Sequence, residues 1–441
     1  MGDGTTTVAV LAGELCREAE KLLQGLMHPQ TVIRGYRQAV AEAHKELMKC
    51  SRDNKENAED FKEDLMNIAR TTLSSKLLSE EREHFARLAV DAVLRVGETG
   101  AGAGNLDYIK IIKKAGGSMK ESFLDEGFIL EKSISVGCPT RKEKPRVIVA
   151  NTPMDYDKIK IHSSKVQVDS MDKVAEIELA EKEKMKVKVE KILAHKPDVF
   201  INRQLIYNYP EQLMAEKGVM VIEHADFDGT ERLAAVLGAQ ILSTFDQPDL
   251  HVLGECELIE QQMLGEDKVI KFSGCKANQA CSIVLRGSGR HILDEAERSL
   301  HDALCVLMQT LKNSKVVFGG GHTEIRMANA VERLAQRVKG KEGMAIEAFA
   351  RALRAIPTAI ADNAGYDSAE LIQNLRAELN EGHPSAGLNM YKGVVGDMEK
   401  LGVTECLRVK EQALVSASKA CEMILRVDEV IKCAPRKRQQ E

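Results

Sequence analysis

The sequence predicts a multidomain α/β protein in which an α/β segment is inserted between two helical regions. Both ends of the chain carry apolar residues at helical spacing, such as Leu11, Leu15 and Leu22 near the start. The middle instead has short β-branched runs, for example residues 147–150, which alternate with helical segments. Because 441 residues are too many for one ordinary core, we expect about three domains, one of them a helical domain built from both ends.

The first helical region is expected to contain four helices. The first follows the turn at residues 2–7, and Pro29 begins the second, since proline is favoured at the first helical position. Two more are expected within residues 61–95, on either side of a turn at residues 71–76. The glycine- and alanine-rich stretch at residues 97–104 interrupts the pattern, and we expect a flexible connector there.

The middle of the chain has the residue pattern expected of an α/β layer. Strand-like runs such as residues 199–201 and 219–222 alternate with helical segments. Between Val174 and Leu193 lies a segment rich in Glu and Lys with only a narrow apolar seam. This segment is either a surface helix with many charge pairs or an arm that touches another molecule, and composition alone favours the surface helix.

Long helices return after residue 287. The first of them is expected to bury a stripe of apolar residues that runs from Ile292 to Leu311, and Asp302 lies just off this stripe. A carboxylate there could face a cleft and activate a water molecule, although spacing alone does not distinguish Asp302 from Asp294 or Glu297. A short strand region is expected near residues 387–395.

Composition excludes several function classes. The net charge of −5 and the absence of tryptophan argue against a nucleic-acid partner, which would favour a basic surface and stacking aromatics. The sequence has no apolar run long enough to span a bilayer, so no membrane contact is expected. The ten cysteines are scattered without a CxxC pair, which is typical of reduced thiols in the cytosol.

The densest chemical signal is the run at residues 2–7, with the sequence GDGTTT directly before a helix. Glycines allow unusual backbone conformations, and N–H groups at the positive end of a helix bind phosphate. Asp3 would repel phosphate by itself, so it favours an intervening Mg²⁺. The alternative is a polar turn in which Asp3 or a threonine caps the helix. The six residues alone do not decide between the two.

A second glycine run occupies residues 319–321, between a strand-like run and a helix. A ligand could approach the backbone there, although an isolated run of three glycines is more often a simple turn. The sequence has no P-loop, no dinucleotide-binding glycine motif, no HExxH and no GxSxG. A standard nucleotide or hydrolase motif is therefore absent from this sequence.

Eight motifs are spread along the chain. Outside the middle they are, in order, GDGTTT at 2–7, TTLSSK at 71–76, HDAL at 301–304, FGGG at 318–321, DNAGYD at 362–367 and GVTECLRVK at 402–410. In the middle they are NRQLIYNYPEQL at 202–213 and IEHADF at 222–227. With these motifs in this order, the chain resembles the group II chaperonins nearly from end to end, and its middle is most similar to the eukaryotic cytosolic branch, CCT.

The resemblance implies the group II chaperonin fold, with a helical equatorial domain, a hinge-like intermediate domain and an α/β apical domain. The implied boundaries are 1–55 and 318–441 for the equatorial domain, 56–127 and 283–317 for the intermediate domain, and 128–282 for the apical domain. It also makes the charged segment, at about residues 162–193, a helical protrusion that closes over a central cavity as a lid.

The resemblance further implies ATP hydrolysis with Mg²⁺, and it allows for K⁺. Asp302 matches the carboxylate that positions and activates the attacking water, and Lys76 matches a lysine that senses the γ-phosphate. The remaining matches are Gly2, Gly4, Thr5, Thr6 and Thr7 at the phosphates, Asp3 at Mg²⁺, Gly320 and Gly321 against ribose and base, Asn389 at the adenine edge, and Glu405 at the ribose hydroxyls.

The partners implied are other chaperonin subunits in a hetero-oligomeric double ring and unfolded cytosolic proteins such as actin and tubulin. The residues matching the client-binding groove of the family are Phe227, Thr230, Arg232 and Leu233. Chaperonin subunits normally have a segment before GDGTTT that includes a second phosphate-binding loop, whereas here Met1 directly precedes Gly2. We therefore also consider a chaperonin-like interaction protein without ATPase activity, and an unrelated ATP-dependent enzyme if the resemblance is discounted.

Overall fold

Two units make up the computed structural model of the chain. One contains Met1–Val90 and Ser299–Glu441, and the other contains Asp91–Arg298. The unit boundaries fall within two continuous helices, α4 (Arg82–Gly97) and α8 (Arg290–Lys312). The structure describes residues 2–97, 106–125, 127–135, 137–154, 171–223, 227–247, 251–265, 267–275, 281–429 and 431–432.

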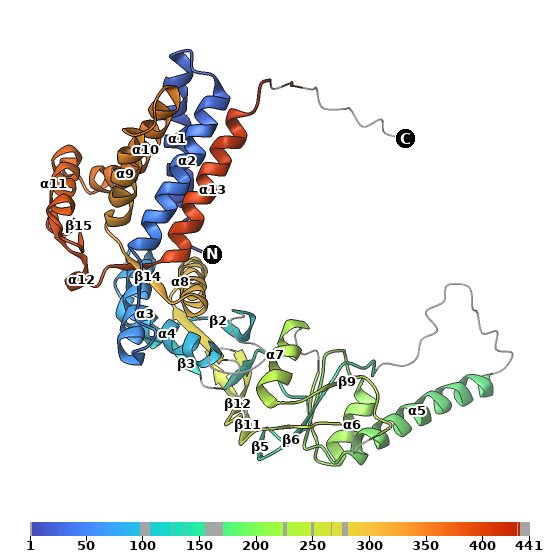
Figure 1. Cartoon of the computed structure of the whole chain (residues 1–441). Helices are drawn as coiled ribbons and strands as arrows, with labels where there is room; N and C mark the ends of the chain where they lie inside the picture. The colour runs from blue at the N-terminus through green and yellow to red at the C-terminus, as the bar shows by residue number, and fades with distance from the viewer. Residues whose placement is uncertain are drawn as a thin grey trace. The chain divides into compact units, whose positions relative to one another are not determined.

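The first unit is built around helices from both ends of the chain, which lie side by side (Figure 1). They are α1 (Thr5–Gln24), α2 (Pro29–Lys49), α9 (His322–Ala335), α10 (Lys341–Asn363) and α13 (Leu407–Leu425). Leu11, Leu15 and Leu414 are buried in their shared core. The ring of Tyr36 meets that of Phe349 edge-on at 5.4 Å, which joins α2 to α10. The helical body expected from the two chain ends is therefore confirmed.

A small sheet crosses the base of this bundle. Its strand order is β1 (Arg52–Asp53), β14 (Lys315–Phe318) and β17 (Thr404–Cys406), with antiparallel pairing throughout. The expected short strand region near residues 387–395 is confirmed, and it is a hairpin of β15 (Ala386–Asn389) and β16 (Val394–Asp397). The other elements of this unit are α3 (Ala58–Leu73), η1 (Leu77–Ser79), α11 (Ser368–Glu381) and α12 (Met398–Leu401).

The second unit is the inserted α/β segment, and it contains three sheets. The five-stranded sheet comprises β10 (Gly254–Glu255), β6 (Arg146–Ala150), β7 (Val199–Asn202) and β8 (Met220–Ile222) in that order, with β9 (Ile241–Leu242) paired to β6. The four-stranded sheet has the order β4 (Phe128–Leu130), β12 (Asp267–Ser273), β11 (Leu258–Leu264), β5 (Arg141–Glu143). The third has the order β2 (Ile109–Ala115), β13 (Cys281–Gly287), β3 (Phe123–Asp125). Short turns of 3₁₀ helix are η3 (Leu106–Tyr108) and η4 (Met119–Glu121).

Within the described residues, three helices lie wholly in this unit: α5 (Met171–Ala194), α6 (Asn208–Glu216) and α7 (Phe227–Leu237). The expected charged helix is confirmed as α5. Of its described apolar residues, Met185, Val189 and Ile192 are buried, whereas Leu179 and Val187 are exposed. Residues 162–170 of the expected protrusion and residues 98–104 of the expected connector lie outside the described residues. None of the described helices combines the length and apolar character needed to cross a membrane.

One residue expected on a buried face proves to be exposed. Ile292 of α8 has 38% of its surface exposed, whereas its neighbour Leu293 is 2% exposed. The expectation for Ile292 was therefore wrong, because helical spacing fixes which residues share a face but not how far the covered face extends around the helix.

Candidate nucleotide site

The glycine-rich turn at residues 2–4 leads directly into α1. Gly4 is the N-cap of α1 and has a φ of 84°, a left-handed conformation that glycine adopts at little cost. No side chain caps the first turn, and Asp3 Oδ1 instead accepts the N–H of Gly4 at 2.8 Å. The alternative in which Asp3 or a threonine caps the helix is therefore not observed. The N–H groups of the first turn, at residues 5–7, can meet an anion.

A cavity of about 780 Å³ opens beside this turn. Its volume is within the usual range for small-molecule sites. Of the predicted nucleotide residues, its lining includes Asp3, Gly320, Asn389 and Glu405. The lining also includes most of the turn at residues 71–75 and apolar side chains that include Ile68, Val306, Ile360, Leu388 and Leu401. Four predicted residues that are far apart in the sequence thus surround one cavity.

The second glycine run links β14 to α9 and forms part of the cavity wall. Gly320 has a φ of 63°, and a Cβ added to it would lie 2.7 Å from Met398 Sδ. The same Cβ would lie 3.1 Å from the backbone nitrogen of Leu388, whose N–H donates to the Gly320 carbonyl at 2.8 Å. Gly321 follows as the N-cap of α9, with a φ of 76°. This turn therefore has no room for a side chain at Gly320.

The turn also positions β15, which ends at Asn389. The Asn389 side chain is largely buried, and its Oδ1 accepts the backbone N–H of Tyr391 at 3.1 Å. Tyr391 lines the cavity and is 83% exposed, and its hydroxyl accepts a hydrogen bond from Arg82 at 3.3 Å. The apolar wall and the fixed amide group together form a surface suited to a planar base.

Asp302 and Lys76 form an ion pair, with Lys76 Nζ 2.6 Å from Asp302 Oδ2. Their side chains are only 24% and 17% exposed, respectively. Neither residue is in the lining of the 780 Å³ cavity. However, a Cβ added to Gly2 would meet Cys305 Cβ at 2.4 Å and would lie 3.8 Å from the Asp302 Cα. The turn at residues 2–4 therefore packs directly on the part of α8 that carries Asp302.

Glu405 belongs to a cluster of charges that sequence reasoning missed. Strand β17 pairs with β14 and brings Glu405 opposite Val317, next to the glycine turn. Lys410 Nζ lies 2.9 Å from Glu405 Oε2 and 2.6 Å from Glu324 Oε1. Glu405 and Lys410 lie in one sequence motif, but Glu324 is 86 residues before Lys410. Only the fold brings these three residues together.

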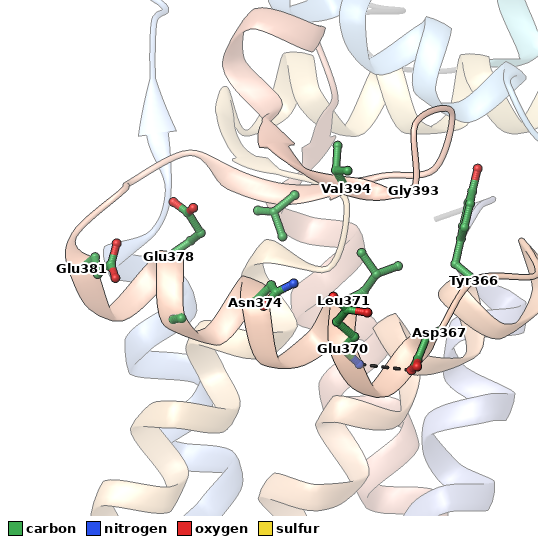
Figure 2. A pocket seen from close by; sticks show the side chains of 11 residues that line it. Tyr366, Asp367, Glu370, Leu371, Asn374, Glu378, Glu381, Gly393 and Val394 are labelled. Atoms are coloured by element: carbon green, nitrogen blue, oxygen red, sulfur yellow. Dashed lines mark hydrogen bonds between the residues drawn. The ribbon is translucent and has the colours of Figure 1, made fainter.

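A second cavity, of about 510 Å³, lies between α11 and the β15–β16 hairpin (Figure 2). Carboxylates from α11 and its N-cap line it: Asp367, Glu370, Glu378 and Glu381. The N-cap carboxylate accepts the backbone N–H of Glu370 at 3.2 Å. Four carboxylates repel phosphate, so this cavity is not the nucleotide site.

The predicted client residues lie on α7 of the second unit. Thr230 and Leu233 are 1% and 0% exposed, so in this structure they pack inside the unit and do not present a surface to a client. Arg232 is half-buried, and the side chain of Phe227 lies outside the described residues. Among the described side chains of the predicted set, Arg232 alone is accessible for direct contact.

Comparison with known proteins matches the chain to the TCP-1/cpn60 chaperonin family over residues 1–435. It is 59% identical to T-complex protein 1 subunit beta of Arabidopsis thaliana, over 100% of this chain and 82% of the relative. Identity to the Homo sapiens protein of the same name is 59%, over 99% of this chain and 81% of the relative. A probable subunit beta of Schizosaccharomyces pombe is 52% identical, over 100% and 82% of the two chains.

A solved structure gives the same result for the fold. The open-state monomer of a group II chaperonin from Methanococcoides burtonii matches with a TM-score of 0.70 at 30% identity, covering 97% of this chain and 100% of that chain. The expected group II chaperonin fold is therefore confirmed, and an unrelated small-molecule enzyme is excluded. The beta-subunit relatives also agree with the motifs in the middle of the chain. The chain is an ATP-dependent chaperonin subunit, and it belongs to the TCP-1/cpn60 chaperonin family.

Proposed function

We propose that this chain binds ATP with Mg²⁺ in the 780 Å³ cavity and hydrolyses it, with Asp302 as the group that activates water. The observation that carries the proposal is the convergence of Asp3, Gly320, Asn389 and Glu405 on one cavity beside an uncapped helix N-terminus. Phosphoryl transfer depends mainly on positioning and charge stabilisation, and this arrangement supplies both.

Each group has a role that follows from its chemistry. The N–H groups of the first turn of α1, with the hydroxyls of Thr5, Thr6 and Thr7, bind the phosphates. The Asp3 carboxylate is a hard oxygen donor beside these groups, so it fits Mg²⁺. When bound, the ion neutralises phosphate charge. The base lies against Asn389, and K⁺ is a further cation that phosphate charge could attract.

The Lys76–Asp302 pair supplies the catalytic step. In this structure the ammonium of Lys76 holds the Asp302 carboxylate at 2.6 Å. A γ-phosphate gives Lys76 a second anionic partner, so Asp302 can accept a hydrogen bond from the attacking water and take its proton. Hydrolysis therefore begins only once the terminal phosphate is in place.

Substitution of Asp3 by asparagine tests the Mg²⁺ assignment. Asn is nearly isosteric but uncharged, so the Mg²⁺ concentration for half-maximal ATP binding should rise about tenfold or more, while metal-free ATP binds equally well or better. Titration of Mg²⁺ at fixed ATP, followed by calorimetry, measures both. Asp53→Asn, at the exposed edge strand β1, is the control. Unchanged Mg²⁺ dependence in Asp3→Asn would remove Asp3 from the site. If the unsubstituted chain binds no ATP, the alternative applies instead, namely a chaperonin-like interaction protein without ATPase activity.

We further propose that the chain works in the cytosol, in a hetero-oligomeric double ring that folds actin and tubulin. The equatorial, intermediate and apical boundaries expected from the sequence are part of this proposal, as is the lid role of α5. Client contact on α7 is then assigned to Arg232 and to Phe227, the first residue of the helix. A photo-crosslinker at Arg232 should capture unfolded actin several times more strongly than one at Lys217 of the same unit. Equal capture at both positions would contradict the assignment.

A further inference from the structure

Lys410 lies between two carboxylates that come from different elements. Its Nζ is 2.6 Å from Glu324 Oε1 on α9 and 2.9 Å from Glu405 Oε2 on β17. The Glu324 and Lys410 side chains are 2% and 11% exposed. The other oxygen of Glu324 accepts the hydroxyl of Thr323 at 2.9 Å. Buried charges are costly unless they are paired, so this row of three charges needs its ion pairs to be maintained.

The three residues are not equivalent, because one end of the row is fixed and the other opens on the cavity. Glu324 lies in the first turn of α9, where the helix dipole favours a negative charge. Glu405 is 28% exposed and lines the nucleotide cavity. The fixed carboxylate therefore anchors Lys410, and Lys410 in turn anchors the carboxylate that faces the ligand.

We propose that Lys410, anchored by Glu324, is a positioning residue that holds the Glu405 carboxylate in place to accept hydrogen bonds from the ribose hydroxyls. Lys410 itself does not touch the nucleotide. The inference rests on the proposed function, because it takes the ribose of ATP to lie against Glu405. It adds two residues, neither of which lines the cavity, and it assigns them control of sugar recognition.

The electrostatics of the cavity agree with this role. Burial raises the pKa of Glu405, and Glu324 and Asp3 raise it further, while Lys410 opposes the rise. Burial alone would lower the pKa of Lys410, but its two carboxylate partners raise it, so the ammonium stays charged. Arg70 of α3 also lines the cavity and is paired with Glu83. Without Lys410, Glu405 would therefore be protonated over a wider pH range and would lose an acceptor oxygen.

Comparison of ATP with 2′,3′-dideoxy-ATP measures this role. The Kd for each nucleotide is determined with the full chain. The Kd for 2′,3′-dideoxy-ATP divided by the Kd for ATP reports recognition of the ribose hydroxyls. A charged hydrogen bond should make the ratio about 10 to 100 in the unsubstituted chain. Lys410→Met should lower the ratio at pH 7 and let it recover as the pH is raised, because a Glu405 carboxyl whose pKa is raised ionises at higher pH. Glu405→Gln should give one reduced ratio at every pH, because its amide oxygen still accepts a hydrogen bond but carries no charge and does not ionise.

Two further variants separate positioning from folding. Lys410→Arg keeps the charge and should keep most of the ratio. Glu324→Gln removes the charge that anchors Lys410 and should lower the ratio, but by less than Lys410→Met does. Arg351→Met is the control, because Arg351 pairs with buried Glu18 in the same bundle and lies outside the cavity lining. It should leave the ratio unchanged. Thermal unfolding of each variant confirms that it is folded.

The outcomes that overturn the inference are distinct from those that overturn the proposed function. If Lys410→Met weakens ATP and the dideoxy analogue equally at every pH, Lys410 is merely structural. If the unsubstituted chain binds both nucleotides equally, Glu405 does not read the ribose, although the nucleotide site stands. If it binds neither, the proposed nucleotide site fails and the inference fails with it.

Discussion

Asp302→Asn should slow ATP hydrolysis by this chain about 100- to 1,000-fold while ATP affinity changes by less than about threefold. Asparagine keeps the shape of the side chain and can still meet Lys76, which lies 2.6 Å from Asp302 in this structure. It cannot take a proton from water, so only the chemical step should suffer. Single-turnover hydrolysis, with ATP binding measured on the same preparation, separates the two quantities.

Asp294→Asn is the matched control for this experiment. Asp294 lies on the same helix, and sequence spacing alone did not distinguish it from Asp302. In the structure its side chain is 47% exposed and is paired with Lys113, whose hydrogen bond lowers the pKa of Asp294. This substitution should leave hydrolysis unchanged. Equal rates for Asp302→Asn and Asp294→Asn would mean that another group activates the water.

Gly320→Ala should cost about 2–4 kcal/mol of unfolding free energy and weaken ATP binding more than tenfold. The φ of 63° strains any side chain, and the added Cβ would lie 2.7 Å from Met398 Sδ and 3.1 Å from the backbone nitrogen of Leu388. Methionine can move, but the backbone of β15 cannot move without displacing Asn389. Chemical denaturation and ATP titration measure the two effects.

Gly365→Ala separates backbone strain from the loss of space. Gly365 also has a positive φ, of 78°, but a Cβ there would meet nothing within 4 Å. Gly365→Ala should lower the unfolding free energy only by the backbone strain, about 1–2 kcal/mol, and should leave ATP binding intact. If Gly320→Ala costs no more than Gly365→Ala and binds ATP normally, the glycine turn is not part of the nucleotide site.

Local sequence patterns predict the parts of this protein that depend on neighbouring residues. The turn before α1, the strand before the glycine run, and the charged helix α5 all follow from residue type and spacing. The inserted α/β segment is predicted by the change from helical spacing of apolar residues to short β-branched runs along the chain. These features are encoded within about 20 residues, which is the range over which periodicity and turn chemistry act.

The parts that could not be predicted depend on contacts between distant segments. The pairing of Lys410 with Glu324 joins two helix starts 86 residues apart. The pairing of Lys76 with Asp302 spans 226 residues. Burial of Thr230 and Leu233 depends on how α7 packs within its unit, and family resemblance placed them at a surface without that information. For such contacts, the sequence gives the candidate residues, whereas the fold decides the partners.

The site of nucleotide binding can be tested directly by photolabelling the full chain with 8-azido-ATP and mapping the labelled peptide. We expect the label on the β15–β16 hairpin, near Asn389 and the exposed Tyr391, and we expect excess ATP to prevent labelling. Label on α11, beside the acidic cavity of Figure 2, or in the second unit, and equally present with excess ATP, would contradict it.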